Sequence, residues 1–211
     1  MFQPPIFHED RLDVMEELMV AHPFATIVSS ATGPLTADHV PLVLKKETGI
    51  IHLQGHIAAN NPLFRETHGP VEVLTIFQGP QSYVTPSWYA SKQEHGKVVP
   101  TWNYVVVHAR GIVQFNRESD WLLRHLDDLT RQHESHREEP WAVSDAPSDF
   151  VERQLRGLVG FDITIEDLKG TWKVSQNKAL KDWEGVKAGL EREDSPNAGE
   201  MARLVEERAR P

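Results

Sequence analysis

The stretch Phe77–Gly111, FQGPQSYVTPSWYASKQEHGKVVPTWNYVVVHARG, guides the interpretation of the whole chain. Two apolar runs typical of strands, Val71–Phe77 and Asn103–Ala109, flank a segment crowded with aromatic and small polar residues. All three Tyr of the chain lie in this stretch, together with Trp88 and Trp102. Such side chains combine a flat apolar face with a polar edge, which suits a planar ligand with heteroatoms on its rim. Packing inside a β-sheet core is the commoner use of these residues, so both interpretations stay open.

The composition is that of an acidic chain without cysteine. Its 211 residues are enough for one well-formed core, and its net charge is −9, from 22 basic and 31 acidic residues. Because proteins that hold DNA by its phosphates carry a basic face, direct DNA binding is doubtful. No apolar run is long enough to cross a membrane, and the start MFQPPIFHEDR lacks the pattern of a secretory signal. With no Cys there are no disulfides or thiolate sites, and these features together predict a cytoplasmic protein.

Hydrophobic patterns predict short strands with local connections and helices towards the end of the chain. Strands are expected over residues 24–30, 35–44, 50–55, 71–77, 82–85, 99–115 and 158–165, with residues 172–176 following a Gly turn. Helices are expected over residues 10–22, 119–134, 149–156, 181–192 and 196–208. Pro41 should bend the second strand or place it at an edge. The order favours an α+β arrangement on an antiparallel barrel of about six or seven strands.

Motifs for the common catalytic and metal sites are missing from the sequence. It contains no HExxH, GxGxxG, GxxxxGK[ST] or GxSxG, and its His residues are scattered, so we expect no metal site. Polar side chains do gather after the third predicted strand, where His56, Asn60 and Asn61 precede Pro62. Exposed backbone N–H groups at a helix start attract anions such as phosphate. A polar turn with a capping residue is an equally good interpretation.

Several separate motifs resemble one protein family. They are TADHVPL (Thr36–Leu42), GHIAANNP (Gly55–Pro62), FQGPQSYVTPSWY (Phe77–Tyr89), VPTWNYVVVHARG (Val99–Gly111) and GLVGFDITIEDLKGTWKVSQNK (Gly157–Lys178). In order and spacing they resemble the PaiB family of FMN-binding negative transcriptional regulators, connected with protease synthesis and sporulation in bacilli. The resemblance implies a flavin-reductase-like fold, a six-stranded antiparallel split β-barrel with flanking helices. It also implies a homodimer with FMN at the subunit interface, residues 1–192 as the FMN-binding domain, and residues 193–211 as a helical tail.

The resemblance further implies which residues meet the cofactor. In related oxidases two adjacent strands and the following loop hold the flavin phosphate, and the corresponding residues here are Thr36, Asp38, His39, His56, Asn60 and Asn61. Trp102 and Asn103 are expected at the flavin ring, since a neutral amide both donates and accepts hydrogen bonds. Lys173, Gln176 and Asn177 are expected to approach from the partner subunit. Lys173 would supply the positive charge that the loop lacks.

Three functions are compatible with this barrel. The first is an FMN-binding regulator of transcription, and the second is a flavin-dependent reductase or oxidase. The third is a haem-binding protein that uses a His as axial ligand. The sequence shows no evident acid, base or nucleophile, so catalytic activity stays open.

Overall fold

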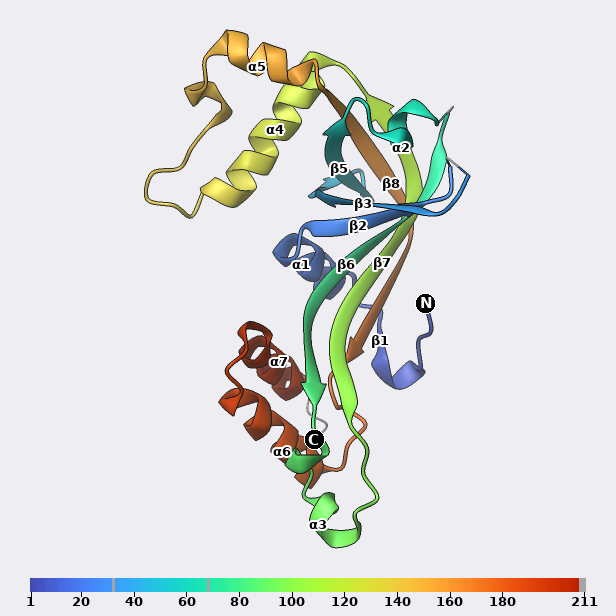
Figure 1. The fold of residues 1–211 in the computed structure, drawn as a ribbon, viewed down its shortest axis with the longest axis vertical. Coiled ribbons are helices and arrows are strands. Elements are labelled where there is room, and N and C mark those ends of the chain that lie inside the picture. Colours follow the sequence, from blue (N-terminus) through green and yellow to red (C-terminus); the bar gives the residue numbers. More distant parts are fainter. Residues whose placement is uncertain (32, 68, 209–211) are drawn as a thin grey trace. The chain divides into compact units, whose positions relative to one another are not determined.

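The computed structural model describes residues 1–31, 33–67 and 69–208. Residue 32, in the predicted turn at 31–34, residue 68, and residues 209–211 of the predicted tail lie outside the described residues. The strands in Figure 1 are β1 (His8–Glu9), β2 (Phe24–Ser29), β3 (Thr36–Pro41), β4 (Val43–Glu47), β5 (Ile50–Ala58), β6 (Val71–Val84), β7 (Thr101–Asn116) and β8 (Leu158–Lys173). The α-helices are α1 (Leu12–Ala21), α2 (Pro62–Arg65), α3 (Ser91–His95), α4 (Ser119–Glu134), α5 (Ser148–Leu155), α6 (Leu180–Arg192) and α7 (Pro196–Glu207). Short 3-10 helices are η1 (Pro5–Phe7), η2 (Pro86–Trp88) and η3 (Val143–Asp145).

Within the described part of the chain, the strands form one eight-stranded sheet in the order β3-β2-β6-β7-β8-β5-β4, and β1 pairs with β8. The pairs β2–β3, β4–β5 and β5–β8 are antiparallel. Strands β3 and β4 stand at opposite ends of this order, although only Leu42 separates them in sequence. The sheet therefore curls into an antiparallel half-barrel, and the expected α+β barrel architecture is confirmed.

The chain divides into two compact units. Unit 1 comprises Met1–Leu18, Gln78–Val107 and the chain from Lys169 onward, and unit 2 comprises Met19–Phe77 and His108–Leu168. Strands β6, β7 and β8 contribute residues to both units. Each unit is described below by its own contacts.

The core of unit 2 follows from the alternation of apolar residues along its strands. Leu53 in β5 and Phe161 and Ile163 in β8 are completely buried on the inner face of the sheet. Gly55 faces Phe161, and a Cβ at this glycine would lie 2.4 Å from the ring. Gly55 is therefore needed for the ring of Phe161 to fill the core at this point.

Unit 1 is held together by two C-terminal helices and an aromatic side chain. Helices α6 and α7 pack side by side, and the side chains of Val186 and Val205 are completely buried. The ring of Trp88 lies against α6, where a Cβ at Gly189 would come within 2.2 Å of it. The two predicted C-terminal helices thus bury one face each. Helix α6 packs against η2 and α7, and α7 packs against α6.

Two predicted element boundaries were wrong, and one predicted strand is divided. The strand predicted at 35–44 divides into β3 and β4, and β3 ends at Pro41, where a bend or an edge was expected. The segments 71–77 and 82–85 were predicted as separate strands but belong to the single strand β6. The Gly turn predicted before Trp172 is absent, since β8 continues to Lys173. The physical reason is close packing: a Cβ at Gly79 would lie 2.7 Å from Leu18, and one at Gly170 would lie 3.0 Å from Glu9. These glycines serve close packing inside strands rather than turns.

The start of the predicted polar segment at His56–Glu66 also differs. Strand β5 runs on to Ala58, so His56 is a strand residue, and the helical part is the short α2. No helix in the described residues has the length and apolarity needed to span a membrane.

Candidate functional site

The predicted site residues separate into two groups, one in each unit. Unit 2 contains Thr36, Asp38, His39, His56, Asn60 and Asn61, and unit 1 contains Trp102, Asn103, Lys173, Gln176 and Asn177. We describe the two groups separately.

In unit 2, Asp38 and Asn61 join the end of β5 to β3. The Asn61 amide Nδ2 donates to Asp38 Oδ1 at 2.7 Å, and its Oδ1 accepts from the backbone N–H of Leu63 at 2.8 Å. Asn61 is thereby the N-cap of α2, as the pattern Asn-Pro predicts. Asn60, next to it, is exposed. The pairing fixes the loop and leaves Asn60 available to a ligand.

His39 and Thr36 lie on the exposed part of β3. His39 Nδ1 and Thr26 Oγ1 are 3.0 Å apart, and the Thr36 hydroxyl donates to the carbonyl of Ser29 at 3.4 Å. Asp38 and His39 alternate along the strand and so face opposite sides of the sheet. The side chains that gather near this edge are neutral apart from the carboxylate of Asp38.

His56 points away from that edge, towards α4. Its Nδ1 is 3.1 Å from His125 Nε2, and the two rings meet edge to face. Burial lowers the pKa of His56, and burial together with the repulsion from His56 lowers the pKa of His125 to about 4. Both imidazoles are therefore neutral at pH 7. Sequence reasoning missed His125, which lies 69 residues from its partner.

In unit 1, Trp102 belongs to an exposed aromatic patch. Its indole Nε1 donates to Gln81 at 3.0 Å, and its ring meets Tyr83 edge to face at 6.0 Å. About half of each ring's residue surface is exposed, 49% for Trp102 and 48% for Tyr83. The flat apolar surface predicted from the sequence is thus present in this unit.

Lys173 carries a half-buried positive charge next to aromatic rings. Its Nζ donates to Thr101 Oγ1 at 2.9 Å and lies 6.0 Å from the centroid of the Tyr104 ring. Among the residues that the structure describes, no carboxylate forms an ion pair with this ammonium group. Burial, and then repulsion from Lys178, lowers the pKa of Lys173.

Lys178 and Tyr89 extend this group, although the sequence did not single them out. The Nζ of Lys178 lies 4.2 Å from the centroid of the Tyr89 ring. The Tyr89 hydroxyl is buried and has no hydrogen-bond partner within the described residues. The sequence feature that could have indicated Lys178 is its place at the end of the motif WKVSQNK, which also contains Lys173.

The position of Tyr89 is fixed by α6. The carboxylate of Asp182 accepts from the backbone N–H of Ser91 at 2.9 Å and from its hydroxyl at 2.7 Å. The ring of Trp88 lies against Gly189, and a Cβ at Gly185 would clash with the Trp88 carbonyl. These contacts hold the aromatic segment after β6 in one conformation.

Asn103 and Gln176 are occupied by contacts inside unit 1. Asn103 is completely buried, donates to Ser175 Oγ at 2.9 Å and accepts from the same hydroxyl at 3.2 Å. As predicted, it faces opposite to Trp102. Gln176 accepts from the backbone N–H of Val174 at 2.8 Å and donates to the carbonyl of Ile6 at 3.1 Å. Asn177 is exposed.

The donor set of unit 1 fits FMN better than that of unit 2 alone. A phosphate dianion is held best by charged donors, and a flavin ring by flat apolar faces. Lys173 and Lys178 supply two ammonium groups, and Tyr89 supplies a buried hydroxyl that lacks a partner among the described residues. Unit 2 offers neutral donors beside a carboxylate. Lys173, Lys178 and Tyr89 are therefore the residues that would hold the anionic part of the cofactor.

Comparison with known proteins establishes the class. Residues 1–167 match the family described as an FMN-binding domain, and the chain belongs to that family. The FAD and heme binding protein from Mycobacterium smegmatis has the same fold, with a TM-score of 0.58 at 15% identity, over 86% of this chain and 80% of that chain. The predicted split-barrel fold is confirmed, and so is FMN as the cofactor of the family.

Two relatives that align over nearly the whole of this chain show which group of the family it belongs to. The "Protease synthase and sporulation protein PAI 2" of Bacillus subtilis (strain 168) is 33% identical over 208 residues, which are 99% of this chain and 98% of the relative. An uncharacterised protein of Emericella nidulans is 30% identical over an alignment of 244 positions, which covers 99% of this chain and 97% of the relative. The predicted membership of the PaiB group is confirmed.

Proposed function

We propose that the protein is a homodimeric FMN-binding regulator in which each flavin is held by residues of both subunits. One subunit contributes the edge formed by β3 and the loop before α2, and the other contributes the group around Lys173. The observation that carries this proposal is the half-buried ammonium of Lys173, which contacts a hydroxyl and an aromatic ring but no carboxylate of the described residues. An anion that reaches this half-buried cation would provide the counter-ion that it lacks within the described residues.

The different contributions of the two subunits to the proposed site follow from the charges of their side chains. Asn60 and Thr36 are exposed donors without charge, and neutral donors hold a dianion less well than charged ones. Lys173 of the partner subunit would supply the missing charge, and a two-fold axis would make two equal sites. When bound, FMN supplies redox chemistry. The protein's own residues would bind it, orient it and exclude water from it.

The proposed role is negative regulation of transcription, as the PaiB resemblance implies. With a net charge of −9, direct duplex DNA binding should be weak, so regulation would act through another protein or through the redox state of the flavin. A cytoplasmic location, a barrel domain at residues 1–192 and a tail at residues 193–211 stay predictions.

Two measurements on the purified protein test the proposal. We expect a flavin absorption spectrum without a Soret band, and a dimer by light scattering at micromolar concentration. A Soret band would favour haem binding instead, and a monomer that still binds FMN would contradict the shared site. A gel or anisotropy assay at physiological salt tests the second part. Tight, sequence-selective binding to a duplex would restore a direct repressor.

A further inference from the structure

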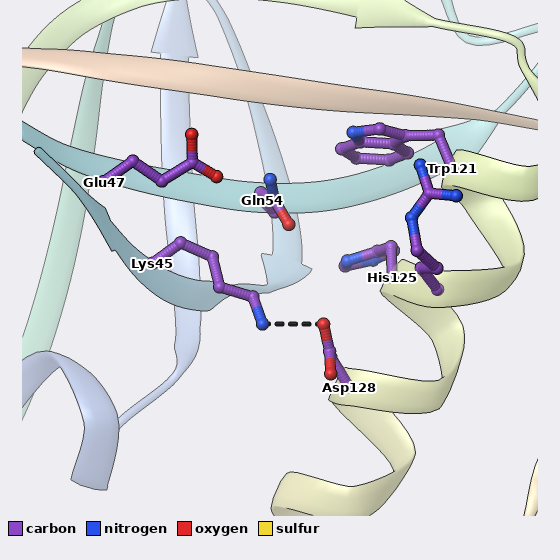
Figure 2. Close-up of a pocket in the computed structure, with 7 residues that line it drawn as sticks. Lys45, Glu47, Gln54, Trp121, His125 and Asp128 are labelled. Carbon is purple, nitrogen blue, oxygen red and sulfur yellow. Dashed lines mark hydrogen bonds and ion pairs between the residues drawn. The ribbon is translucent and has the colours of Figure 1, made fainter.

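Unit 2 contains a pocket that shares no lining residue with the proposed flavin site. It lies between α4 and strands β4 and β5 and has a volume of about 270 Å³, just below the roughly 300–1,000 Å³ typical of ligand pockets. Figure 2 shows the side chains around it. The lining residues are Lys45, Glu47, Gln54, Trp121, Arg124, His125 and Asp128.

One wall of the pocket is aromatic and rigid. The ring of Trp121 stacks on His125 with centroids 5.5 Å apart and an interplanar angle of 21°. Trp121 fits there because β8 has a glycine at position 160, where a Cβ would lie 2.2 Å from the indole. His125 is in turn held by His56. The wall thus presents an edge of the Trp121 ring to the pocket, because one face of the ring lies on His125 and its six-membered part lies against Gly160.

His125 also has an unsatisfied polar atom. Its side chain is 1% exposed, and its Nδ1 has no hydrogen-bond partner among the residues described. In Figure 2 the ring extends from α4 into the space between the helix and β5. A buried polar atom without a partner costs free energy, so the environment of this ring is sensitive to changes in the pocket wall.

The charges around the pocket are of both signs. Lys45 and Asp128 neutralise each other through an ion pair of 2.6 Å. Arg124 and Glu47 form no ion pair with any residue that the structure describes, so one cation and one anion are left for a ligand. Gln54 donates its Nε2 to Asp162 at 3.0 Å, and Figure 2 shows its oxygen directed towards the pocket.

We propose that this pocket binds a free α-amino acid with a flat apolar side chain. The ligand carboxylate would pair with Arg124, its ammonium group with Glu47 and the Gln54 oxygen, and its flat side chain would meet the edge of the Trp121 ring. A zwitterion uses both unpaired charges, whereas a phosphate dianion would meet the carboxylates of Glu47 and Asp128. The assignment is independent of the proposed function, because none of these residues belongs to the flavin site.

A set of three small molecules tests the charge requirement on the full-length, FMN-loaded protein. The probes are L-phenylalanine, 3-phenylpropionate, which lacks the ammonium group, and 2-phenylethylamine, which lacks the carboxylate. Binding is measured by calorimetry and by the NMR signals of the His125 ring. We expect L-phenylalanine to bind about 10-fold or more tightly than either analogue, since each lost partner leaves a charge unpaired. Equal affinity for the three probes, or no binding of L-phenylalanine at millimolar concentration, would overturn the proposal.

Variants locate the site and separate it from the flavin. Arg124→Gln and Glu47→Gln should each weaken L-phenylalanine about 10-fold to 100-fold. Arg153→Gln is the matched control, because this arginine lies on α5 and pairs with Asp149 at 2.6 Å. FMN titrations of all three variants should equal the wild type. If L-phenylalanine binds unchanged to both pocket variants, the site is wrong. If FMN fails to bind at all, only the proposed function fails.

Discussion

The two units treat their buried ionisable groups in opposite ways. Unit 2 buries His56 and His125 as a neutral pair, since burial lowers the pKa of both rings. Unit 1 buries Glu9 as an anion. Burial raises the pKa of this carboxyl group, but hydrogen bonds from Arg11 and Arg208 outweigh that effect and hold the pKa at about 2. Lys173 in the same unit is half-buried without a carboxylate partner among the described residues, and burial lowers its pKa.

The difference shows which unit contains a buried or half-buried charge that needs a partner. A neutral buried pair needs no counter-charge, so unit 2 loses little when one ring is replaced by an apolar side chain. A buried ion needs its partner, and removing that partner leaves an uncompensated charge. Unit 1 satisfies Glu9 within the protein but leaves Lys173 to be satisfied by an anion. The predictions below test this contrast.

The largest expected effect comes from Glu9→Gln. Glu9 is 2% exposed and accepts from the backbone N–H and guanidinium of Arg11 and from the guanidinium of Arg208. The neutral amide in Glu9→Gln cannot form the ion pair with Arg208, so this guanidinium loses its counter-ion. We expect the free energy of unfolding to fall by about 3 kcal/mol. Chemical denaturation measures this loss.

Two further variants complete this comparison. Glu17→Gln, at an exposed position of α1, should change the stability by less than about 0.5 kcal/mol. His125→Leu in unit 2 removes a neutral group and should cost only about 1 kcal/mol. A loss for His125→Leu as large as that for Glu9→Gln would contradict the contrast between the units.

As the pH falls, the loss of stability that comes from the neutral pair His56–His125 should appear before the loss that comes from Glu9. The pKa of His125 is about 4 in the folded protein and 6.5 in the unperturbed group, so the unfolded chain binds more protons between these values. Stability is therefore complete above pH 6.5 and falls as the pH drops towards 4, by up to about 3 kcal/mol. His125 faces His56 on β5, Lys45 on β4 and Asp128 on its own helix, and all three contribute to this value. The contribution of Glu9 falls at lower pH, between 4.5 and about 2.

Denaturation curves between pH 7 and pH 4.5 measure this dependence. In His125→Leu the slope of stability against pH should become shallower over this range, while Glu9→Gln should leave it unchanged. Identical slopes in the wild type and His125→Leu would show that the pair does not carry the pH dependence.

The flavin site gives the next largest effect. Lys173→Ala should weaken FMN about 10-fold to 100-fold, the loss for one charged hydrogen bond, and less at high salt if the contact is exposed. Asn103→Ala should weaken it by about threefold at most, because both atoms of this buried amide already bond to Ser175. Lys97→Ala, an exposed lysine of the same unit, is the control. If FMN affinity is unchanged in both variants while the dimer stays folded, the site lies elsewhere, and the loop at Asn60 becomes the next candidate.

Much of the fold could be predicted because it depends on local patterns. The helix at 10–22 and the helices after residue 119 have apolar residues at helical spacing, and the structure confirms them within a few residues. The continuity of β6 and β8 could not be predicted. Glycine signals a turn in sequence, and only packing partners distant in sequence, such as Leu18 beside Gly79, show that it serves a close approach.

The candidate site could be predicted only as a set of residues. Family motifs named Asp38 and Asn61, which the structure brings together, and Lys173, which it places among aromatic rings. They also named His56, whose partner is decided by α4 lying over β5 and not by any motif. Pairings of this kind depend on contacts between residues far apart in sequence, so the resemblance could indicate the family but not the contacts.

The smallest expected effect concerns the coupling of Lys173 to Lys178. Burial lowers the pKa of Lys173 first, and repulsion from Lys178 lowers it further. Lys178→Ala removes the repulsion but not the burial, so the pKa of Lys173 should rise and still stay below that of an exposed lysine. Titration of the lysine side chains by NMR measures this rise, with Lys97→Ala as the control. In the FMN titration the same variant should lose less affinity than Lys173→Ala, because Lys173 and its contact with Thr101 remain in place. If the pKa of Lys173 does not change in Lys178→Ala, the two ammonium groups are too far apart to act on one anion. Lys173 alone would then be the cation that unit 1 offers to an anionic ligand.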